Sequence, residues 1–199
     1  MEIYNENITK IKGIGPKKAE LLNKAGISAV GELLYCFPSR YDFYKYYESP
    51  DDINESGKAV FCIDYDGTAN RKYSPQTGYY VKWQCRSGQK NITFTWFNQP
   101  YIVNSLVKNK KYCVKCDIEY RGGTLSAVNP HFTVKCDLKS SIFEPVYRTP
   151  SGISSNQFAG FVRNALEFAG NELRDDIPEE LRGKYDIPTL KEALEEVHF

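Results

Sequence analysis

Two aromatic residues stand four positions apart around a proline, in the segment Thr95-Trp96-Phe97-Asn98-Gln99-Pro100-Tyr101. In the alternating pattern before the proline, Trp96 shares a face with Phe94 and is expected in the core, whereas Phe97 points to the other face. Flat rings at an exposed corner can stack on nucleobases, at about 1–3 kcal/mol per base and without reading sequence. Phe97 and Tyr101 therefore predict a stacking platform or wedge for nucleic acid. The alternative is that Phe97 covers the open end of a barrel and Tyr101 packs beneath a helix.

Cations lie beside aromatic rings in two expected loops, and one strand face offers a further lysine. The side chains that we expect to contact a nucleic-acid backbone are Arg71, Lys72, Tyr73, Lys82 and Arg121. Proteins that bind single strands or junctions combine stacking rings with cations that hold phosphates. Such loops also occur on barrels that bind proteins, so they do not identify the partner alone.

A glycine-rich turn precedes an apolar helical stripe in residues 11–22. Gly13 and Gly15 would let backbone amides at a helix start approach a phosphate, and Lys17 and Lys18 would add charge to that contact. The segment is similar to the hairpin of helix-hairpin-helix DNA-binding modules. The alternative is that the hairpin only packs against its neighbour.

Catalytic and metal-binding patterns are missing from the sequence. Cys113 and Cys116 are closely spaced, but a spacing of three on a strand puts the sulfurs on opposite faces. Only His131 and His198 could complete a zinc site. The chain has no Gly-x-x-x-x-Gly-Lys-Ser/Thr phosphate loop and no Gly-x-Ser-x-Gly nucleophile turn. We therefore expect no catalytic residue, no metal and no cofactor in this chain.

The composition is that of a folded protein: 199 residues, 41% of them hydrophobic and 14% aromatic, can form a compact core with helical additions. With 26 basic and 25 acidic side chains, any basic footprint must be local. Residues 9–24 hold five lysines and one acid, which places the expected basic face toward the amino end. Scattered cysteines and the lack of a leader or a membrane-length apolar run predict a soluble cytoplasmic protein with free thiols.

The apolar spacing predicts helices at both ends and strands between them. In residues 1 to about 50, Pro16 begins a helix that Gly26 ends, and Ser28 caps a second one. Capping boxes at 154–157 and 189–192 begin helices near the carboxyl end. The period changes to two from residue 58, which predicts five strands. They are expected at 58–66, 79–85, 92–97, 112–119 and 124–128, with a helical turn at 100–106.

This order of elements predicts an α+β fold, with a five-stranded OB-type Greek-key barrel between helical segments. A fragment of a β-sandwich is the structural alternative. The amino-terminal flank is expected to be like a helix-hairpin-helix module. The expected division is a helical module at 1–50, an OB-fold domain at 51–137 and a helical linker at 138–199.

Several motifs form an ordered set that covers nearly the whole chain. They are Lys12-Gly13-Ile14-Gly15-Pro16-Lys17-Lys18, Phe37-Pro38-Ser39-Arg40-Tyr41, Trp96-Phe97-Asn98-Gln99-Pro100-Tyr101, Arg121-Gly122-Gly123, Asn129-Pro130, Pro145-Val146-Tyr147 and Glu192-Ala193-Leu194. Together they resemble the amino-terminal wedge region of the RecG family of bacterial ATP-dependent DNA helicases. Asn129 departs from the family, which often has His there, and residues 42–47 are unusually aromatic.

The resemblance implies a barrel that binds single-stranded and branched DNA, such as forks and four-way junctions, and splits duplex arms while a motor translocates. The family's two aromatics that stack at the branch point fall on Phe97 and Tyr101. ATP and Mg²⁺ would bind in the motor, which this chain lacks, so the chain alone is not expected to be an enzyme. We expect a monomer near the bacterial nucleoid, with no membrane partner.

Two other functions stay open at this point. The barrel could dock the tail of a single-strand-binding protein in a groove of exposed aromatics. It could also be a general single-strand binder, which would show no preference for a fork over an oligonucleotide of matching length.

Overall fold

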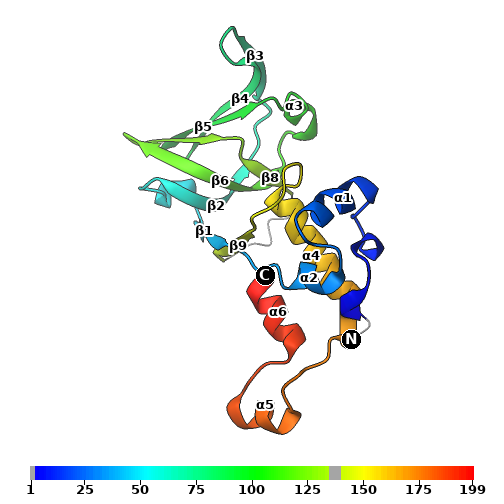
Figure 1. Cartoon of the computed structure of the whole chain (residues 1–199). Coiled ribbons are helices and arrows are strands. Elements are labelled where there is room, and N and C mark those ends of the chain that lie inside the picture. The colour runs from blue at the N-terminus through cyan, green and yellow to red at the C-terminus, as the bar shows by residue number, and fades with distance from the viewer. Residues whose placement is uncertain (1–2, 135–139) are drawn as a thin grey trace. The chain divides into compact units, whose positions relative to one another are not determined.

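A computed structural model describes residues 3–134 and 140–199, which form two compact units (Figure 1). The described residues up to Asp42 and from Glu144 onward make up unit 1, and those from Phe43 to Phe143 make up unit 2. Unit 1 is mainly helical, and unit 2 is mainly a β-sheet, so the predicted α+β class is confirmed. The predicted domain boundaries after residues 50 and 137 remain predictions.

Unit 1 combines helices from both ends of the chain. Its α-helices are α1 (Pro16–Lys24), α2 (Val30–Leu34), α4 (Ser155–Ala169), α5 (Glu179–Tyr185) and α6 (Leu190–His198), and its 3-10 helices are η1 (Ile3–Asn5), η2 (Ile8–Lys10) and η4 (Gly170–Glu172). As predicted, Pro16 begins α1, and Gly26 follows its end with a φ of 82°. No helix within the described residues is long and apolar enough to cross a membrane.

The helix caps follow the sequence in two places and differ in a third. The Gln157 N–H donates to Ser154 Oγ at 3.2 Å, and the Glu192 N–H donates to Thr189 Oγ1 at 3.2 Å, so both predicted capping boxes are confirmed. In α2 the capping position belongs to Ala29, not to Ser28. Ser28 instead donates its backbone N–H and its hydroxyl to the Glu32 carboxylate, and the three hydrogen bonds that this carboxylate accepts lower its pKa.

The core of unit 1 forms around the apolar face of α4, to which α1, α2 and α6 contribute. His198, at the end of α6, is fully buried in this region. Its Nε2–H donates to the Leu34 carbonyl at 2.8 Å, and its Nδ1 accepts from the Tyr147 hydroxyl at 2.8 Å, which describes a neutral ring. Burial lowers the pKa of His198, opposed in part by the hydrogen bond to Leu34.

Unit 2 contains most of a nine-stranded sheet, and the two strands at one edge of it, β1 (Arg40–Tyr46) and β9 (Ile142–Val146), continue along the chain into unit 1. The strands are β1 (Arg40–Tyr46), β2 (Gly57–Asp64), β3 (Asn70–Ser74), β4 (Gly78–Ser87), β5 (Lys90–Phe97), β6 (Lys111–Arg121), β7 (Thr124–Val128), β8 (His131–Thr133) and β9 (Ile142–Val146), with η3 (Pro50–Asp52) and α3 (Ile102–Ser105). The five predicted strands correspond to β2, β4, β5, β6 and β7, and the predicted helical turn is α3.

Four strands were not predicted. β1 lies in the segment assigned to helices, and β3 occupies a segment assigned to a loop. Both are mostly polar or mixed in character, so they lack the apolar alternation that marks a half-buried strand. β8 and β9 are short and join the sheet through long-range partners, which local periodicity does not reveal.

The strand order is β3-β4-β5-β7-β6-β2-β1-β9, with β8 paired to β6. The pairs β4–β5, β6–β7 and β2–β6 are antiparallel, and β5–β7 is parallel. Closure of a five-stranded barrel would also need β2 to pair with the β3–β4 hairpin. No such ladder is recorded in the part of the chain that the structure describes.

Large aromatic side chains fill the core of unit 2. Trp83 and Phe94 lie opposite each other on β4 and β5, with ring centroids 5.1 Å apart, and both are fully buried. Trp96 and Phe132 pack against the same group, with centroids 5.3 Å apart. Aromatic pairs of this kind add to the free energy gained by burying apolar area, so this group determines which face of β4 and β5 is inward.

The buried imidazole predicts a pH-dependent contribution to the stability of unit 1. Because the pKa of His198 is lowered in the folded state, its contribution is complete above the unfolded value of about 6.5 and is lost as the pH falls through the folded value. We expect the stability advantage of the unmodified chain over His198→Gln to be larger at pH 7.5 than at pH 5, in urea unfolding. His131→Gln, at an exposed histidine, is the control. An advantage that is equal at both pH values would contradict this assignment.

Candidate nucleic-acid interface

β5 ends at an aromatic corner whose two faces differ in burial. Trp96 is fully buried, and its Nε1–H donates to the Pro130 carbonyl at 3.0 Å. Phe97 lies on the opposite face, half-buried, with its ring centroid 5.8 Å from that of Tyr80. The faces predicted for Trp96 and Phe97 are therefore confirmed.

Two asparagines shape the turn that follows Phe97. Asn98 and Asn129 have φ angles of 57° and 48°, in the left-handed region that asparagine tolerates better than most residues. The Phe97 N–H donates to Asn129 Oδ1 at 2.8 Å, while the Asn129 N–H donates to the Thr95 carbonyl at 2.7 Å. Asn129 thus holds the backbone of Phe97 in place, a positioning role that local sequence does not reveal because the two residues are far apart along the chain.

Tyr101 lies at the start of α3 and is 60% exposed. Its hydroxyl donates to Gln99 Oε1 at 3.1 Å, within the same turn. This exposure argues against the alternative that Tyr101 packs beneath the helix. The corner therefore presents one half-buried ring and one exposed ring within four residues of each other.

The strand register brings two of the predicted cations to the Phe97 face. Lys72, Tyr80 and Phe97 stand opposite one another across β3, β4 and β5, so their side chains share a face. Lys82 lies on the same face, opposite Thr95. Within the described residues, neither lysine takes part in an ion pair. Their charges are therefore available to an anionic ligand.

Arg71 and Tyr73 lie on the other face of the β3–β4 hairpin, because Arg71 stands opposite the buried Val81. The Arg71 Nε–H donates to the Pro100 carbonyl at 3.2 Å, which ties β3 to the aromatic corner. Tyr73 faces Tyr79, and both are exposed. Tyr79 shares a face with the buried Val81 and so resembles a core residue in the sequence, but it is exposed in the hairpin.

Arg121 is not brought to the corner. It stands opposite Thr124, which in turn stands opposite Asn91 near the other end of β5. Phe97 lies six positions beyond Asn91 on the strand, about 20 Å at the usual rise. Arg121 is also paired with Glu119, at 2.6 Å.

The amino-terminal hairpin in unit 1 packs closely against α4. The Asn164 amide donates to the Lys12 carbonyl at 2.7 Å, and a side chain at Gly13 would meet Phe161, with a Cβ to ring-carbon distance of 3.4 Å. Gly13 has a φ of 93°, which favours glycine, whereas Gly15 has an ordinary φ of −82° as the N-cap of α1. The structure thus accounts for Gly13 by packing.

Most of the basic charge predicted for the amino end is already used within the protein. Lys10 pairs with Glu6 at 2.5 Å, and Lys24 pairs with Glu20 at 2.8 Å. Lys18 donates to the Gly152 carbonyl at 2.5 Å and to the Gln157 amide oxygen at 3.2 Å. Among the five lysines, Lys12 and Lys17 make no such contact with described residues.

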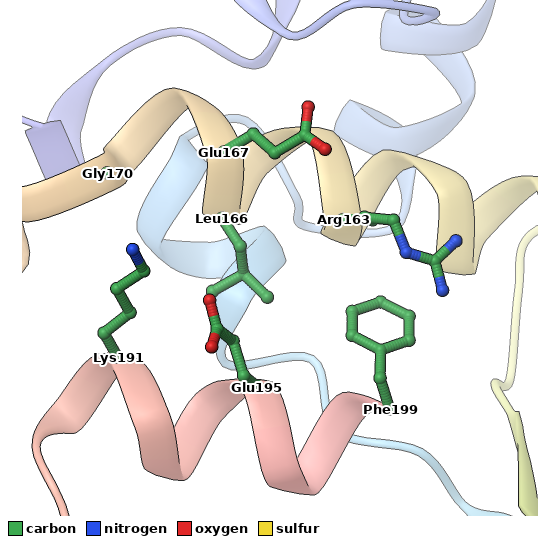
Figure 2. A pocket seen from close by; sticks show the side chains of 7 residues that line it. All are labelled: Arg163, Leu166, Glu167, Gly170, Lys191, Glu195 and Phe199. Carbon is green, nitrogen blue, oxygen red and sulfur yellow. The ribbon is translucent and has the colours of Figure 1, made fainter.

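A cavity of about 390 Å³ lies between α4 and α6 in unit 1 (Figure 2). Figure 2 shows Arg163 reaching from α4 toward the ring of Phe199, and the guanidinium carbon is 4.2 Å from the ring centroid. Arg163 and Lys191 are balanced by Glu167 and Glu195 in the lining. This balance gives the cavity no preference for a polyanion.

The closely spaced thiols of β6 lie apart, as predicted. Cys116 belongs to the core of unit 2, whereas Cys113 lies on the other face, opposite Cys62. Burial raises the pKa of Cys113 to about 11 and that of Cys116 to about 12, so both remain protonated at neutral pH. No group of metal-ligating side chains is found among the described residues. The predicted free thiol of Cys136 lies outside them.

Comparison with known proteins shows which family has this arrangement of corner, sheet and helices. Residues 7–168 match the family described as RecG wedge domain. The chain belongs to the RecG wedge domain family. The sequence-based resemblance is therefore confirmed, and the paired aromatics, the amino-terminal hairpin and most of α4 all fall within the matched residues.

Relatives and a solved structure extend over almost the entire chain. This chain is 29% identical over 202 residues to the ATP-dependent DNA helicase RecG of Bacillus subtilis (strain 168), and the alignment covers 96% of this chain and 28% of that protein. It is 25% identical over 190 residues to the RecG of Streptococcus pneumoniae serotype 4, covering 95% and 27%. The solved structure described as RecG bound to a three-way DNA junction has a TM-score of 0.85 at 24% identity, over 98% of this chain and 27% of that one. The chain thus spans less than a third of these proteins.

The two hairpin glycines of this wedge domain should respond differently to substitution. Gly13→Ala should lower the free energy of unfolding by about 1–2 kcal/mol, because its positive φ disfavours a Cβ and Phe161 limits the space. Gly15→Ala should cost less than about 1 kcal/mol, since the site is open and alanine is only a poorer N-cap. Urea unfolding of both variants tests this. Equal losses would contradict the packing role of Gly13.

Proposed function

We propose that this wedge domain binds branched DNA as part of an ATP-dependent DNA helicase that acts in fork rescue, recombination and repair. The observation that carries the proposal is the corner from Phe97 to Tyr101. There, Asn129 fastens the turn and the Tyr101 ring is 60% exposed. The two relatives described above, both named ATP-dependent DNA helicase RecG, support the same proposal, although this chain aligns with only 28% and 27% of their lengths.

The corner can act on a branch point through stacking. The last base pair of each duplex arm has lost a stacking neighbour, and an aromatic face replaces it at about 1–3 kcal/mol per base. Phe97 and Tyr101 would cap these bases, while Lys72 and Lys82 on the Phe97 face and Arg71 on the other hold phosphates. Phosphate contacts weaken steeply with salt and carry no sequence information. The domain would therefore recognise the shape of the DNA.

The remaining parts of the activity belong, in this proposal, to sequence outside this chain. The relatives are more than three times as long as the matched region, and their names include ATP-dependent helicase activity. ATP and Mg²⁺ would bind there, so the wedge alone would bind branched DNA without unwinding it. We further propose that the protein acts as a monomer in the bacterial cytoplasm, at the nucleoid.

We also propose that unit 2 is an OB-type barrel with added strands. The parallel β5–β7 pair between antiparallel pairs is the feature that supports it. The amino-terminal hairpin, with Gly13 and Gly15, is proposed as the counterpart of a helix-hairpin-helix turn. Lys17 would supply a cation there, whereas Lys18 is held by Gly152 and Gln157.

The binding proposal is tested with a three-strand fork, a linear duplex and a single strand at low salt. We expect the unmodified chain to prefer the fork, and Phe97→Ala/Tyr101→Ala to lose at least about tenfold in fork affinity, since each lost stack is worth about 1–3 kcal/mol. Fluorescence anisotropy with labelled DNA measures both.

Phe143→Ala/Tyr185→Ala is the matched control, since it removes two exposed rings from β9 and α5. It should bind the fork as the unmodified chain does. An equal affinity of the unmodified chain for the fork and the single strand, with weaker binding of the linear duplex, would support a general single-strand binder. Equal or absent binding of all three DNAs would support a protein-docking barrel, which titration with the tail peptide of a single-strand-binding protein would then test.

A further inference from the structure

The β3–β4 hairpin carries two large aromatic side chains that the core does not use. Tyr73 and Tyr79 stand directly opposite each other, are 63% and 67% exposed, and have ring centroids 5.1 Å apart at an interplanar angle of 57°. They continue the face on which Val81 and Trp83 are fully buried. In Figure 1 the hairpin extends beyond the other strands of the sheet, so this face continues past the core.

The two tyrosines border a cavity of about 370 Å³, which is lined by Arg71, Lys72, Tyr73, Tyr79, Tyr80 and Pro100. A cross-strand tyrosine pair alone could simply stabilise the hairpin. A cavity is not needed for that purpose, and neither tyrosine hydroxyl has a hydrogen-bond partner among the described residues. Aromatic walls with a few polar groups are typical of a site for a flat ligand.

The charge of this cavity is positive and unopposed. The Nε–H of Arg71 donates to the Pro100 carbonyl at 3.2 Å, which leaves the four other N–H donors of the guanidinium for a ligand. Lys72 is exposed and has no ion pair within the described chain. No carboxylate lines the cavity. Rings beside such cations suit a base with its flanking phosphate.

Two of the lining residues adjoin the aromatic corner. Pro100 directly precedes Tyr101, and the ring of Tyr80 has its centroid 5.8 Å from that of Phe97. A strand that leaves its partner at Phe97 and Tyr101 would meet this cavity within the next few nucleotides.

We propose that Tyr73 and Tyr79 form a second stacking site, which holds an unpaired base of the single-stranded DNA arm next to the branch point, with Arg71 and Lys72 on the adjacent phosphates. The inference rests on the proposed function for the position of the arm. Binding of a single strand to the cavity does not depend on it. The substrate class of this site is single-stranded DNA, not duplex.

The test compares the full 199-residue chain with Tyr73→Ala/Tyr79→Ala on three probes: a thymidine oligonucleotide, a fork with one single-stranded arm, and a three-way junction that is duplex throughout. We expect the variant to lose about 5- to 150-fold in affinity for the oligonucleotide and the armed fork, the value of one base stack. Affinity for the all-duplex junction should change less than about twofold, because the base-pair caps at Phe97 and Tyr101 remain. Tyr73→Phe/Tyr79→Phe should retain binding, and Phe143→Ala/Tyr185→Ala is the control for losing exposed rings.

A second measurement locates the base directly. 2-Aminopurine placed at successive positions of the arm should be quenched at one position near the branch point, and Tyr73→Ala/Tyr79→Ala should abolish that quenching. An equal loss of affinity for the armed fork and the all-duplex junction would overturn the proposal, as would unchanged oligonucleotide binding. If Phe97→Ala/Tyr101→Ala leaves junction binding intact while Tyr73→Ala/Tyr79→Ala lowers oligonucleotide binding, the proposed function fails and this site stands. Loss of an acidic peptide's binding without loss of DNA binding would assign the cavity to a protein partner.

Discussion

The buried indole of Trp96 is the constraint on which the interface depends. Its full burial, with the N–H satisfied by Pro130, fixes which face of β5 is inward. An unpaired indole N–H in that position would be costly, so the register of β5 cannot slip by one residue without exposing Trp96 and burying Phe97. The same contact draws residues 129–130 toward the strand, where Asn129 fastens the next backbone amide. The packing of Trp96 in the core and the position of the proposed stacking ring of Phe97 therefore depend on the same contacts.

Local sequence was sufficient where a feature depends on neighbours along the chain. The faces of Trp96 and Phe97 follow from strand alternation, and the caps of α4 and α6 follow from residues three positions apart. Features set by distant partners were not accessible. β3 is polar and becomes a strand only by pairing with β4, and Tyr79, on the face of the buried Val81, is exposed in that hairpin. The separation of Arg121 from the corner likewise appears only in the register of β5 and β7.

Positive charges that have no ion pair with a described residue lie not only in the densest group of lysines in the sequence but also elsewhere. The lysine-rich amino end looks like the main basic surface, yet Lys10, Lys18 and Lys24 are engaged within unit 1. The β3–β4 hairpin has fewer cations, but Lys72 and Lys82 have no ion pair with any described residue and share a face with the half-buried rings of Tyr80 and Phe97. For a protein with a net charge of +1, attraction to DNA depends on such uncompensated charges.

The division of the chain into units has a consequence for how the protein is made. Unit 2 is a single continuous stretch, so all of its internal contacts become available once the ribosome has released residue 143. Unit 1 joins segments from the two ends: the hydrogen bond from Asn164 to Lys12 spans 152 positions. Its amino-terminal helices must wait, with their apolar faces uncovered, until α4 is synthesised. Folding during translation would therefore begin with unit 2, and the amino-terminal helices of unit 1, although synthesised first, would pack last.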